Sequence, residues 1–111
     1  MKIYISGKIS GCPIEEAREK FAAAACCLAG LGHTPVNPFD NGVEPTADWS
    51  AQMVRDIELL FGCEAIYLLN DWEDSRGARI EQNIARECGM KIIPQTDMFM
   101  LPSGNYVVYE R

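Results

Sequence analysis

The sequence is poor in histidine and in positive charge. Its 111 residues contain one histidine, and ten Lys and Arg against sixteen Asp and Glu give a net charge of −6. A protein that binds duplex nucleic acid carries a basic face, because phosphate neutralisation supplies most of its affinity. We therefore expect no nucleic-acid partner and no binding to anionic membranes, although a small anionic ligand needs only a local positive patch. The lone His33 excludes a His-rich metal site and is expected in a surface turn.

Long apolar runs and patterned cysteines are also missing. The longest apolar stretch, 21–31, is well short of the roughly 20 residues that a membrane span needs, and no signal peptide precedes the first apolar run. The five cysteines stand at 12, 26, 27, 63 and 88, an odd number without a C-x-x-C pair. This pattern fits neither a disulfide framework nor a zinc site. It predicts reduced, mostly buried thiols in a cytoplasmic protein that contains no metal.

The chain is long enough for one domain, 1–111, and shows no repeat or linker. Apolar patterning predicts strands at 3–5, 34–36, 64–69 and 91–93, and a fifth is possible at 106–109. Helical spacing is found in 14–31, in 49–60 and from Ser75 to about Cys88. This alternation predicts an α/β fold, a flavodoxin- or Rossmann-like three-layer sandwich with a mainly parallel sheet of four to five strands. Ligands of such sheets bind at the carboxyl ends of strands, here the loops 6–12, 37–48 and 70–77.

One carboxylate stands where an apolar residue is expected. At 100° per residue, Glu81 lies at the centre of the apolar arc of the third helix, among Gly77, Ala78, Ile84, Ala85 and Cys88. An unpaired charge facing the sheet would cost several kcal/mol, of the same order as the stability of a whole fold. Glu81 is therefore expected either to be paired, by an ion pair or a tyrosine hydrogen bond of purely structural significance, or to face a functional cavity with a raised pKa.

Trp49, Met53, Ile57 and Leu60 form the apolar stripe of the second helix, and a second acid, Asp56, lies at the edge of that stripe. Such a boundary residue is often only a solvated acid. However, the second and third helices flank the same strand, so Asp56 and Glu81 are able to converge on one cleft. Two carboxylates in unequal environments are the groups that cleave glycosidic bonds, one as nucleophile and one as proton donor.

Positive charge gathers near the start of the third helix, where it opposes the helix dipole. Arg76 and Arg79 either pair at the surface with the preceding acidic loop or, for Arg76, help the helix N-terminus and Ser75 to hold an anion. The loop from Ser6 to Gly11 adds a turn bounded by glycines, without dinucleotide or P-loop spacing. Trp72 is either a stacking surface for a base or a lid over the adjacent strand end.

Three segments, in order and at near-family spacing, together resemble the nucleoside 2-deoxyribosyltransferase superfamily, particularly its small bacterial and phage branch. The resemblance spans 2–93 and rests on Lys2-Ile3-Tyr4-Ile5-Ser6-Gly7 with Gly11, on Arg55-Asp56 followed by Cys63-Glu64-Ala65-Ile66, and on Trp72-Glu73-Asp74-Ser75-Arg76-Gly77-Ala78-Arg79-Ile80-Glu81. The Ser-x-Gly-x-x-x-Glu element is its specific part. The superfamily includes base-exchanging transferases and hydrolases of 2′-deoxynucleoside 5′-monophosphates.

The resemblance implies three catalytic residues. Glu81 matches the nucleophile, Tyr4 the tyrosine that holds it, and Asp56 the acid that assists departure of the base in the hydrolases. Ser75 matches a phosphate-contacting position of the hydrolases, whereas Lys8 replaces a serine there. The predicted substrate-binding residues are Ser6, Gly7, Lys8, Gly11, Asp71, Trp72, Ser75, Arg76 and Gly77.

The activity implied is cleavage or transfer of the N-glycosidic bond of a deoxynucleoside or its monophosphate through a glycosyl-Glu81 intermediate, with no cofactor. The resemblance also implies a homodimer or a higher homo-oligomer. The main alternative is a nucleotide-binding or sensing domain of the same fold that has lost turnover. A purely structural protein is a third possibility, and it would make Glu81, Tyr4 and Ser75 a coincidence.

Overall fold

The computed structural model describes residues 1–100 and 106–108. Helices and strands alternate along the first 94 residues. They are β1 (Lys2–Ser6), α1 (Ile14–Gly30), β2 (Thr34–Val36), α2 (Trp49–Phe61), β3 (Ala65–Leu68), α3 (Arg76–Glu87) and β4 (Lys91–Pro94). Short 3-10 turns follow β2, β3 and β4 at Pro38–Asp40, Trp72–Asp74 and Gln95–Asp97. A hairpin of β5 (Met98–Met100) and β6 (Tyr106–Val108) completes the described chain.

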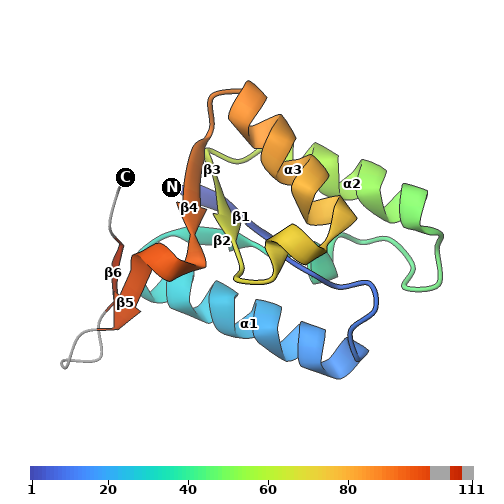
Figure 1. The fold of residues 1–111 in the computed structure, drawn as a ribbon, viewed down its shortest axis with the longest axis horizontal. Coiled ribbons are helices and arrows are strands. Elements are labelled where there is room, and N and C mark those ends of the chain that lie inside the picture. The colour runs from blue at the N-terminus through green and yellow to red at the C-terminus, as the bar shows by residue number, and fades with distance from the viewer. Residues whose placement is uncertain (101–105, 109–111) are drawn as a thin grey trace.

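The four strands β1 to β4 form one parallel sheet in the order β2-β1-β3-β4. Helix α1 covers one face of this sheet, and α2 and α3 cover the other (Figure 1). The three-layer α/β sandwich predicted from the sequence is therefore confirmed. Because all four strands run in the same direction, their carboxyl ends lie at one edge of the sheet.

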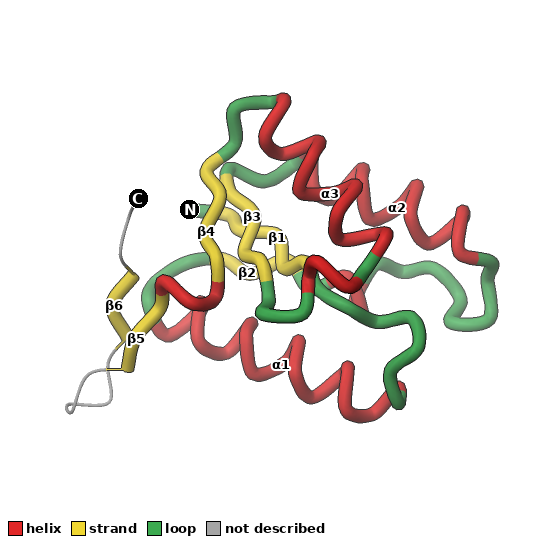
Figure 2. The backbone as a smooth tube through the Cα atoms, viewed as in Figure 1, coloured by secondary structure: helices red, strands yellow, loops and turns green. Residues whose placement is uncertain are grey.

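The possible fifth strand does not extend this sheet. Tyr106–Val108 is a strand, but it pairs antiparallel with Met98–Met100 as a separate two-stranded sheet (Figure 2). A further parallel strand needs a crossover of a dozen or more residues, whereas a hairpin needs only a short turn. The chain between Pro94 and Tyr106 is shorter than that crossover and already contains β5. Residue 109 of the predicted strand lies outside the described residues.

The alternation of side chains along β1 divides the two cores. Ile3 and Ile5 point toward α1 and pack with Phe21 of that helix. Tyr4 points to the opposite face, toward α2 and α3, and the period of two places Ser6 on the same face. All four side chains are almost completely buried. A central strand thus holds two buried hydroxyl groups on the face that α2 and α3 cover.

Gly7 continues β1 at a position where no side chain fits. A Cβ atom built there would lie 2.7 Å from Cδ1 and 2.9 Å from Cβ of Leu69, which is fully buried. We expect Gly7→Ala to lower the free energy of unfolding by about 1–3 kcal/mol, because the core must move to admit the methyl group. Chemical denaturation measures this change. Gly30→Ala is the matched control, because a Cβ there meets nothing within 4 Å, and an unchanged or raised stability of Gly7→Ala would contradict the expectation.

The cysteines are less buried than the sequence suggested. All five thiols are free, but only Cys63 is buried, whereas Cys26 and Cys88 are exposed and the other two are intermediate. The buried face of α1 is formed by Ala17, Phe21, Ala24 and Leu28, which turns Cys26 toward solvent. Cys88 is exposed because it caps the end of α3. The prediction of mostly buried thiols was therefore wrong.

The sequence also predicted a surface turn at His33 and no membrane span. His33 lies in the turn between α1 and β2, partly exposed, with Nδ1 3.1 Å from the terminal amine. Throughout the described part of the chain, none of the helices combines the length and the apolar character that crossing a membrane requires.

Candidate active site

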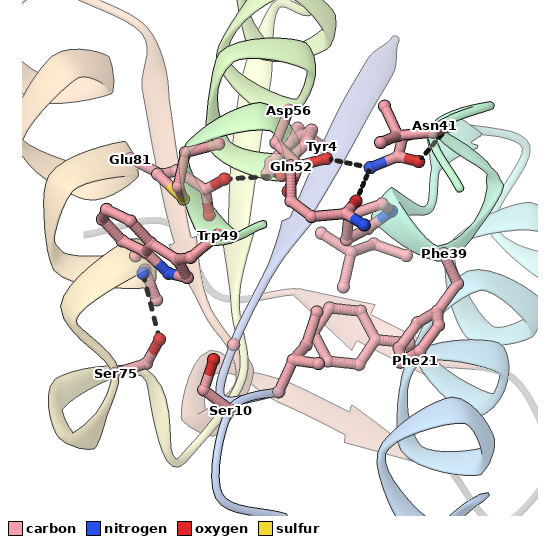
Figure 3. A pocket seen from close by; sticks show the side chains of 18 of the residues that line it. Tyr4, Ser10, Phe21, Phe39, Asn41, Trp49, Gln52, Asp56, Ser75 and Glu81 are labelled. Carbon is pink, nitrogen blue, oxygen red and sulfur yellow. Dashed lines mark hydrogen bonds between the residues drawn. The ribbon is translucent and has the colours of Figure 1, made fainter. Parts of the chain in front are cut away.

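A pocket of about 310 Å³ opens beside the carboxyl end of β1, a volume at the lower end of the range for small-molecule sites. Its walls come from the loop after β1, the first half of α1, the segment 38–45, and the N-terminal halves of α2 and α3. Figure 3 shows its polar side chains converging from these separate elements. It is lined by Tyr4, Ile5, Gly7, Ile9, Ser10, Ile14, Arg18, Phe21, Pro38, Phe39, Asn41, Val43, Pro45, Trp49, Gln52, Met53, Asp56, Ser75, Gly77, Ala78 and Glu81.

Glu81 is held against the sheet by two hydroxyl groups. The Tyr4 hydroxyl donates to Oε2 at 2.6 Å, and the Ser6 hydroxyl donates to Oε1 at 2.8 Å. The carboxyl group belongs to a residue that is only 5% exposed. Its helical neighbours on the buried face, Ala78 and Ala85, are small and let α3 lie close to β1. The anomaly in the sequence is therefore a carboxylate with two fixed donors at the wall of a cavity.

Burial dominates the acidity of Glu81. Desolvation raises its pKa from 4.5 to about 7, against the two hydroxyl hydrogen bonds, which favour the charged form. The negative charge of Asp56 raises it further. At neutral pH the carboxyl group is therefore near its titration midpoint, and carboxyl groups with strongly shifted pKa values cluster at functional sites.

Asp56 reaches the same pocket from α2 and is 7% exposed. Desolvation raises its pKa, whereas a hydrogen bond from Asn41 and the charge of Arg55 oppose the rise. The Asn41 amide nitrogen lies 2.8 Å from Asp56 Oδ1. The structure thus brings Asp56 and Glu81 into one pocket, both with a stabilised neutral form and with different hydrogen-bond partners.

We expect Tyr4→Phe to raise the pKa of Glu81 above its value of about 7, because the hydroxyl bond that favours the carboxylate is lost. A neutral-to-charged hydrogen bond contributes about 1.5–3 kcal/mol, which corresponds to an upward shift of about one to two pKa units. Titration of the carboxyl carbon by NMR measures it. Ser6→Ala should act in the same direction through the other oxygen, and an unshifted Glu81 in both variants would show that these bonds do not set its protonation.

The substrate-binding residues predicted from the sequence are divided between the pocket and its supports. Gly7, Ser75 and Gly77 line the pocket, and Ser6 lies under Glu81. Ser75 also caps α3, since its Oγ accepts from the amide of Ala78 at 3.1 Å and leaves the hydroxyl hydrogen free. A Cβ at Gly77 would lie 3.0 Å from Met53 Sδ, so glycine here lets α2 and α3 pack closely.

Other predicted residues support the pocket from outside its lining. Asp71 accepts from the backbone amide of Lys8 at 3.0 Å and pairs with Lys20, whose ammonium also donates to the Lys8 carbonyl. This clamp fastens the loop after β1 to the loop after β3. Gly11 has a φ of 83°, a conformation that favours glycine. Lys8, Gly11, Asp71 and Arg76 are absent from the lining of this pocket.

Of the two tryptophans, Trp49 lines the pocket and Trp72 does not. Trp72 packs on the apolar layer around Tyr4 and Ile66, as the lid interpretation expected, and does not line the described pocket. Trp49, expected as part of the apolar stripe of its helix, instead lines the pocket and is 38% exposed. The guanidinium of Arg76 lies over its indole ring, 4.0 Å from the ring centre.

The positively charged residue that lines the pocket is not one of those predicted from the sequence. Arg79 donates to the Glu73 carbonyl at 2.7 Å, which matches the surface interpretation. Arg18, which the sequence did not single out, is the one Lys or Arg among the described lining side chains. Asn41 and Gln52 were not predicted either, although the loop 37–48 was expected at the ligand-binding edge. Within the described residues, no three His, Cys, Asp or Glu side chains are grouped to hold a metal ion.

Comparisons with known proteins agree with this architecture. The structure superimposes on a 2-deoxyribosyltransferase of Bacillus psychrosaccharolyticus with a TM-score of 0.66 and 18% identity, covering 85% of this chain and 71% of the other. A 2-desoxiribosyltransferase of Leishmania mexicana gives a TM-score of 0.64 and 19% identity, covering 98% of this chain and 79% of the other. No curated protein matches the chain significantly.

At these identities, the likeness to the two enzymes shows a shared fold. The resemblance that the sequence indicated to deoxyribosyltransferases is confirmed at that level. The model of one protein family, described as a domain of unknown function (DUF4406), matches residues 1–94. The match includes every residue that forms the pocket. The chain therefore belongs to the DUF4406 family and has the fold of the nucleoside 2-deoxyribosyltransferases.

Proposed function

We propose that this protein cleaves the N-glycosidic bond of 2′-deoxynucleosides or their 5′-monophosphates, with Glu81 as nucleophile. The single observation that carries the proposal is the buried Glu81 carboxylate, held by Tyr4 and Ser6 at the wall of a pocket that it shares with Asp56. The fold common to this chain and the two deoxyribosyltransferases supports a nucleoside ligand.

In the proposed reaction, a Glu81 oxygen attacks C1′ while the bond from C1′ to the base nitrogen breaks. The electron pair of that bond stays with the base, which receives a proton from Asp56. The donors on Glu81 fix its carboxylate and leave a lone pair of each oxygen available. Water then attacks C1′ of the glycosyl-enzyme, gives its proton to Asp56 and releases Glu81. A second base in place of water gives transfer.

We also propose a mode of substrate binding in this pocket. Ser10 and the Ser75 hydroxyl lie on the same side of the pocket, next to the N-terminus of α3 (Figure 3). This side suits a 5′-hydroxyl or a 5′-phosphate, because helix N-termini favour anions. Phe21 and Phe39 pack edge to face, with ring centres 5.3 Å apart, and form an apolar wall on the far side from Ser75 (Figure 3). We propose that the base lies between this wall and Asp56.

The test is base release from a panel of deoxynucleosides and their monophosphates, with ribose counterparts and with or without an acceptor base. We expect release from the deoxy substrates and little from ribose, because the 2′-hydroxyl disfavours the oxocarbenium-like state. Chromatography separates the free base from an exchanged nucleoside. Tight binding of the same compounds without release would instead support the nucleotide-sensing alternative. If the protein neither binds these compounds nor releases a base from them, both the enzymatic proposal and the nucleotide-sensing alternative are wrong.

A further inference from the structure

Asn41 is the most constrained polar residue beside the two carboxylates. It is 7% exposed, lies just after the 3-10 turn that follows β2, and uses all its side-chain hydrogens. Its amide nitrogen donates to Asp56 Oδ1 at 2.8 Å and to Gln52 Oε1 at 3.0 Å (Figure 3). Its amide oxygen accepts from the backbone of Val43 at 2.9 Å. A loop residue is thus bonded directly to the proposed proton donor.

Backbone groups fix the orientation of this amide. The N–H of Val43 can only donate, so the oxygen of Asn41 must face it and the nitrogen must face Asp56. The Gln52 amide is fixed in the same way, because its nitrogen donates to the Glu44 carbonyl at 2.9 Å. Reversing either amide would set donor against donor or acceptor against acceptor. The direction of the whole chain of hydrogen bonds therefore follows from the backbone.

The direction of these hydrogen bonds determines which oxygen of Asp56 carries the proton when the carboxyl group is neutral. Oδ1 accepts from an N–H group that cannot accept in return, so a proton on the neutral carboxyl group must sit on Oδ2. Oδ2 has no hydrogen bond to any described residue, and no described side-chain oxygen is both buried and unpartnered. The free oxygen is therefore the one that the pocket leaves accessible. Arg55 anchors the same loop by donating from Nε to the Asn41 carbonyl at 3.1 Å.

We propose that Asn41 is a positioning residue for proton donation: it holds Asp56 Oδ1 so that the proton is presented to the leaving base on Oδ2. The inference rests on the proposed function and adds to it the residue that orients the acid. In the step itself, the O–H bond at Oδ2 breaks as the base nitrogen takes the proton. The electron pair left on Oδ2 makes Asp56 a carboxylate, which the Asn41 N–H bond then stabilises.

The test replaces Asn41 by leucine and follows Asp56 by NMR of its carboxyl carbon, without substrate. The groups that act on Asp56 are Asn41 and Arg55, which lower its pKa, and burial, which raises it; Tyr4 and Glu81 face it from β1 and α3. Asn41→Leu should therefore raise the pKa of Asp56. That shift by itself would favour the protonated acid at neutral pH.

Although more Asp56 would be protonated, we expect the variant to be a slower enzyme. With the proton free to sit on either oxygen, kcat for release of an unactivated base should fall roughly ten- to a hundred-fold. The alkaline limb of the kcat/KM profile should move to higher pH together with the pKa of Asp56. A larger fraction of protonated acid combined with a lower kcat separates lost orientation from lost protonation, and a merely structural residue would produce neither shift.

Asn37→Ala is the matched control. Asn37 caps the same 3-10 turn by accepting from the Phe39 amide at 3.0 Å, and among the described residues it forms no hydrogen bond with Asp56. It should weaken the loop without moving the pKa of Asp56. If Asn41→Leu fails to fold, Asn41→Asp keeps the size and the bond from Val43, and it should raise the pKa of Asp56 more strongly.

An unmoved Asp56 in a folded Asn41 variant, or an equal shift in Asn37→Ala, would overturn the inference. So would an unchanged kcat in an otherwise active protein. Absence of base release by the unaltered protein would instead refute the proposed function, and the titration would still decide whether Asn41 determines the protonation of Asp56.

Discussion

Glu81→Gln is expected to abolish base release and, at the same time, to stabilise the fold above neutral pH. The loss of turnover should be roughly 10³-fold or more, since an amide cannot act as the nucleophile in a covalent mechanism. The gain in stability has a separate origin. It reflects the burial of a carboxylate whose desolvation the bonds from Tyr4 and Ser6 offset only in part.

The gain in stability above neutral pH follows from proton linkage. With a pKa of 4.5 in the unfolded chain and about 7 in the fold, Glu81 binds a proton more tightly in the native state. Its contribution to stability is complete below pH about 4.5 and is progressively lost as the pH rises to about 7, by about 3 kcal/mol in all. The neutral glutamine has no such dependence. Its advantage over the unaltered protein should therefore be largest at pH 8 and should vanish near pH 4.

Glutamine also suits the local hydrogen bonds. Its oxygen accepts from the Tyr4 hydroxyl, and its nitrogen donates to Ser6 Oγ, because a hydroxyl group both donates and accepts. Chemical denaturation at a series of pH values measures the effect, with Glu87→Gln on the exposed end of the same helix as the control. A loss of stability at pH 8 would mean that the charged carboxylate is a structural element. Base release that survives the substitution would remove Glu81 from the reaction.

The sheet and the position of Glu81 are predictable from the sequence for the same physical reason. Apolar period determines which face of an element is buried, so a carboxylate on the buried arc of α3 stands out in the residue pattern alone. Alternation along β1 is equally strict, since it places Tyr4 and Ser6 on the face toward α3. The role of Tyr4 came only from the resemblance, because a tyrosine in a strand breaks no pattern. Asp56 was marked more weakly than Glu81, since it lies at the edge of an apolar stripe and not at its centre.

Residues of the loop 37–48 were beyond such reasoning. Asn41 is buried by turns and backbone hydrogen bonds, which leave no period in the sequence. Its place at the carboxyl end of a predicted strand did mark this loop as a candidate for ligand binding, but it did not indicate which side chain the loop buries. For Trp49 the sequence pattern was misleading in the opposite way, because it predicted burial for a residue that is partly exposed. Its helical spacing with Met53 and Leu60 indicated a core residue, whereas its place in the first turn of α2 leaves it at the pocket.

If Asp56 donates the proton to the leaving base, its removal should matter most for a base that needs that proton. Asp56→Asn should reduce kcat for an ordinary purine deoxynucleoside by roughly 10²–10⁴-fold, the usual contribution of a general acid. The same variant should be far less impaired with an N7-methylated purine deoxynucleoside. That base already carries a positive charge and leaves as a neutral molecule, so it needs no proton. Single-turnover base release measures both rates.

Asp48→Asn is the matched control for this substitution. It makes the same change of carboxylate to amide on the same helix, and asparagine keeps the cap that Asp48 provides to the Ala51 amide at 2.9 Å. If Asp56 donates the proton, only Asp56→Asn should respond to the leaving group. Equal losses with both substrates would mean that Asp56 acts through binding or through the charge of Glu81, whose pKa it raises. The ratio of the two rates therefore separates a proton donor from a neighbouring charge, a distinction that the loss of activity alone does not make.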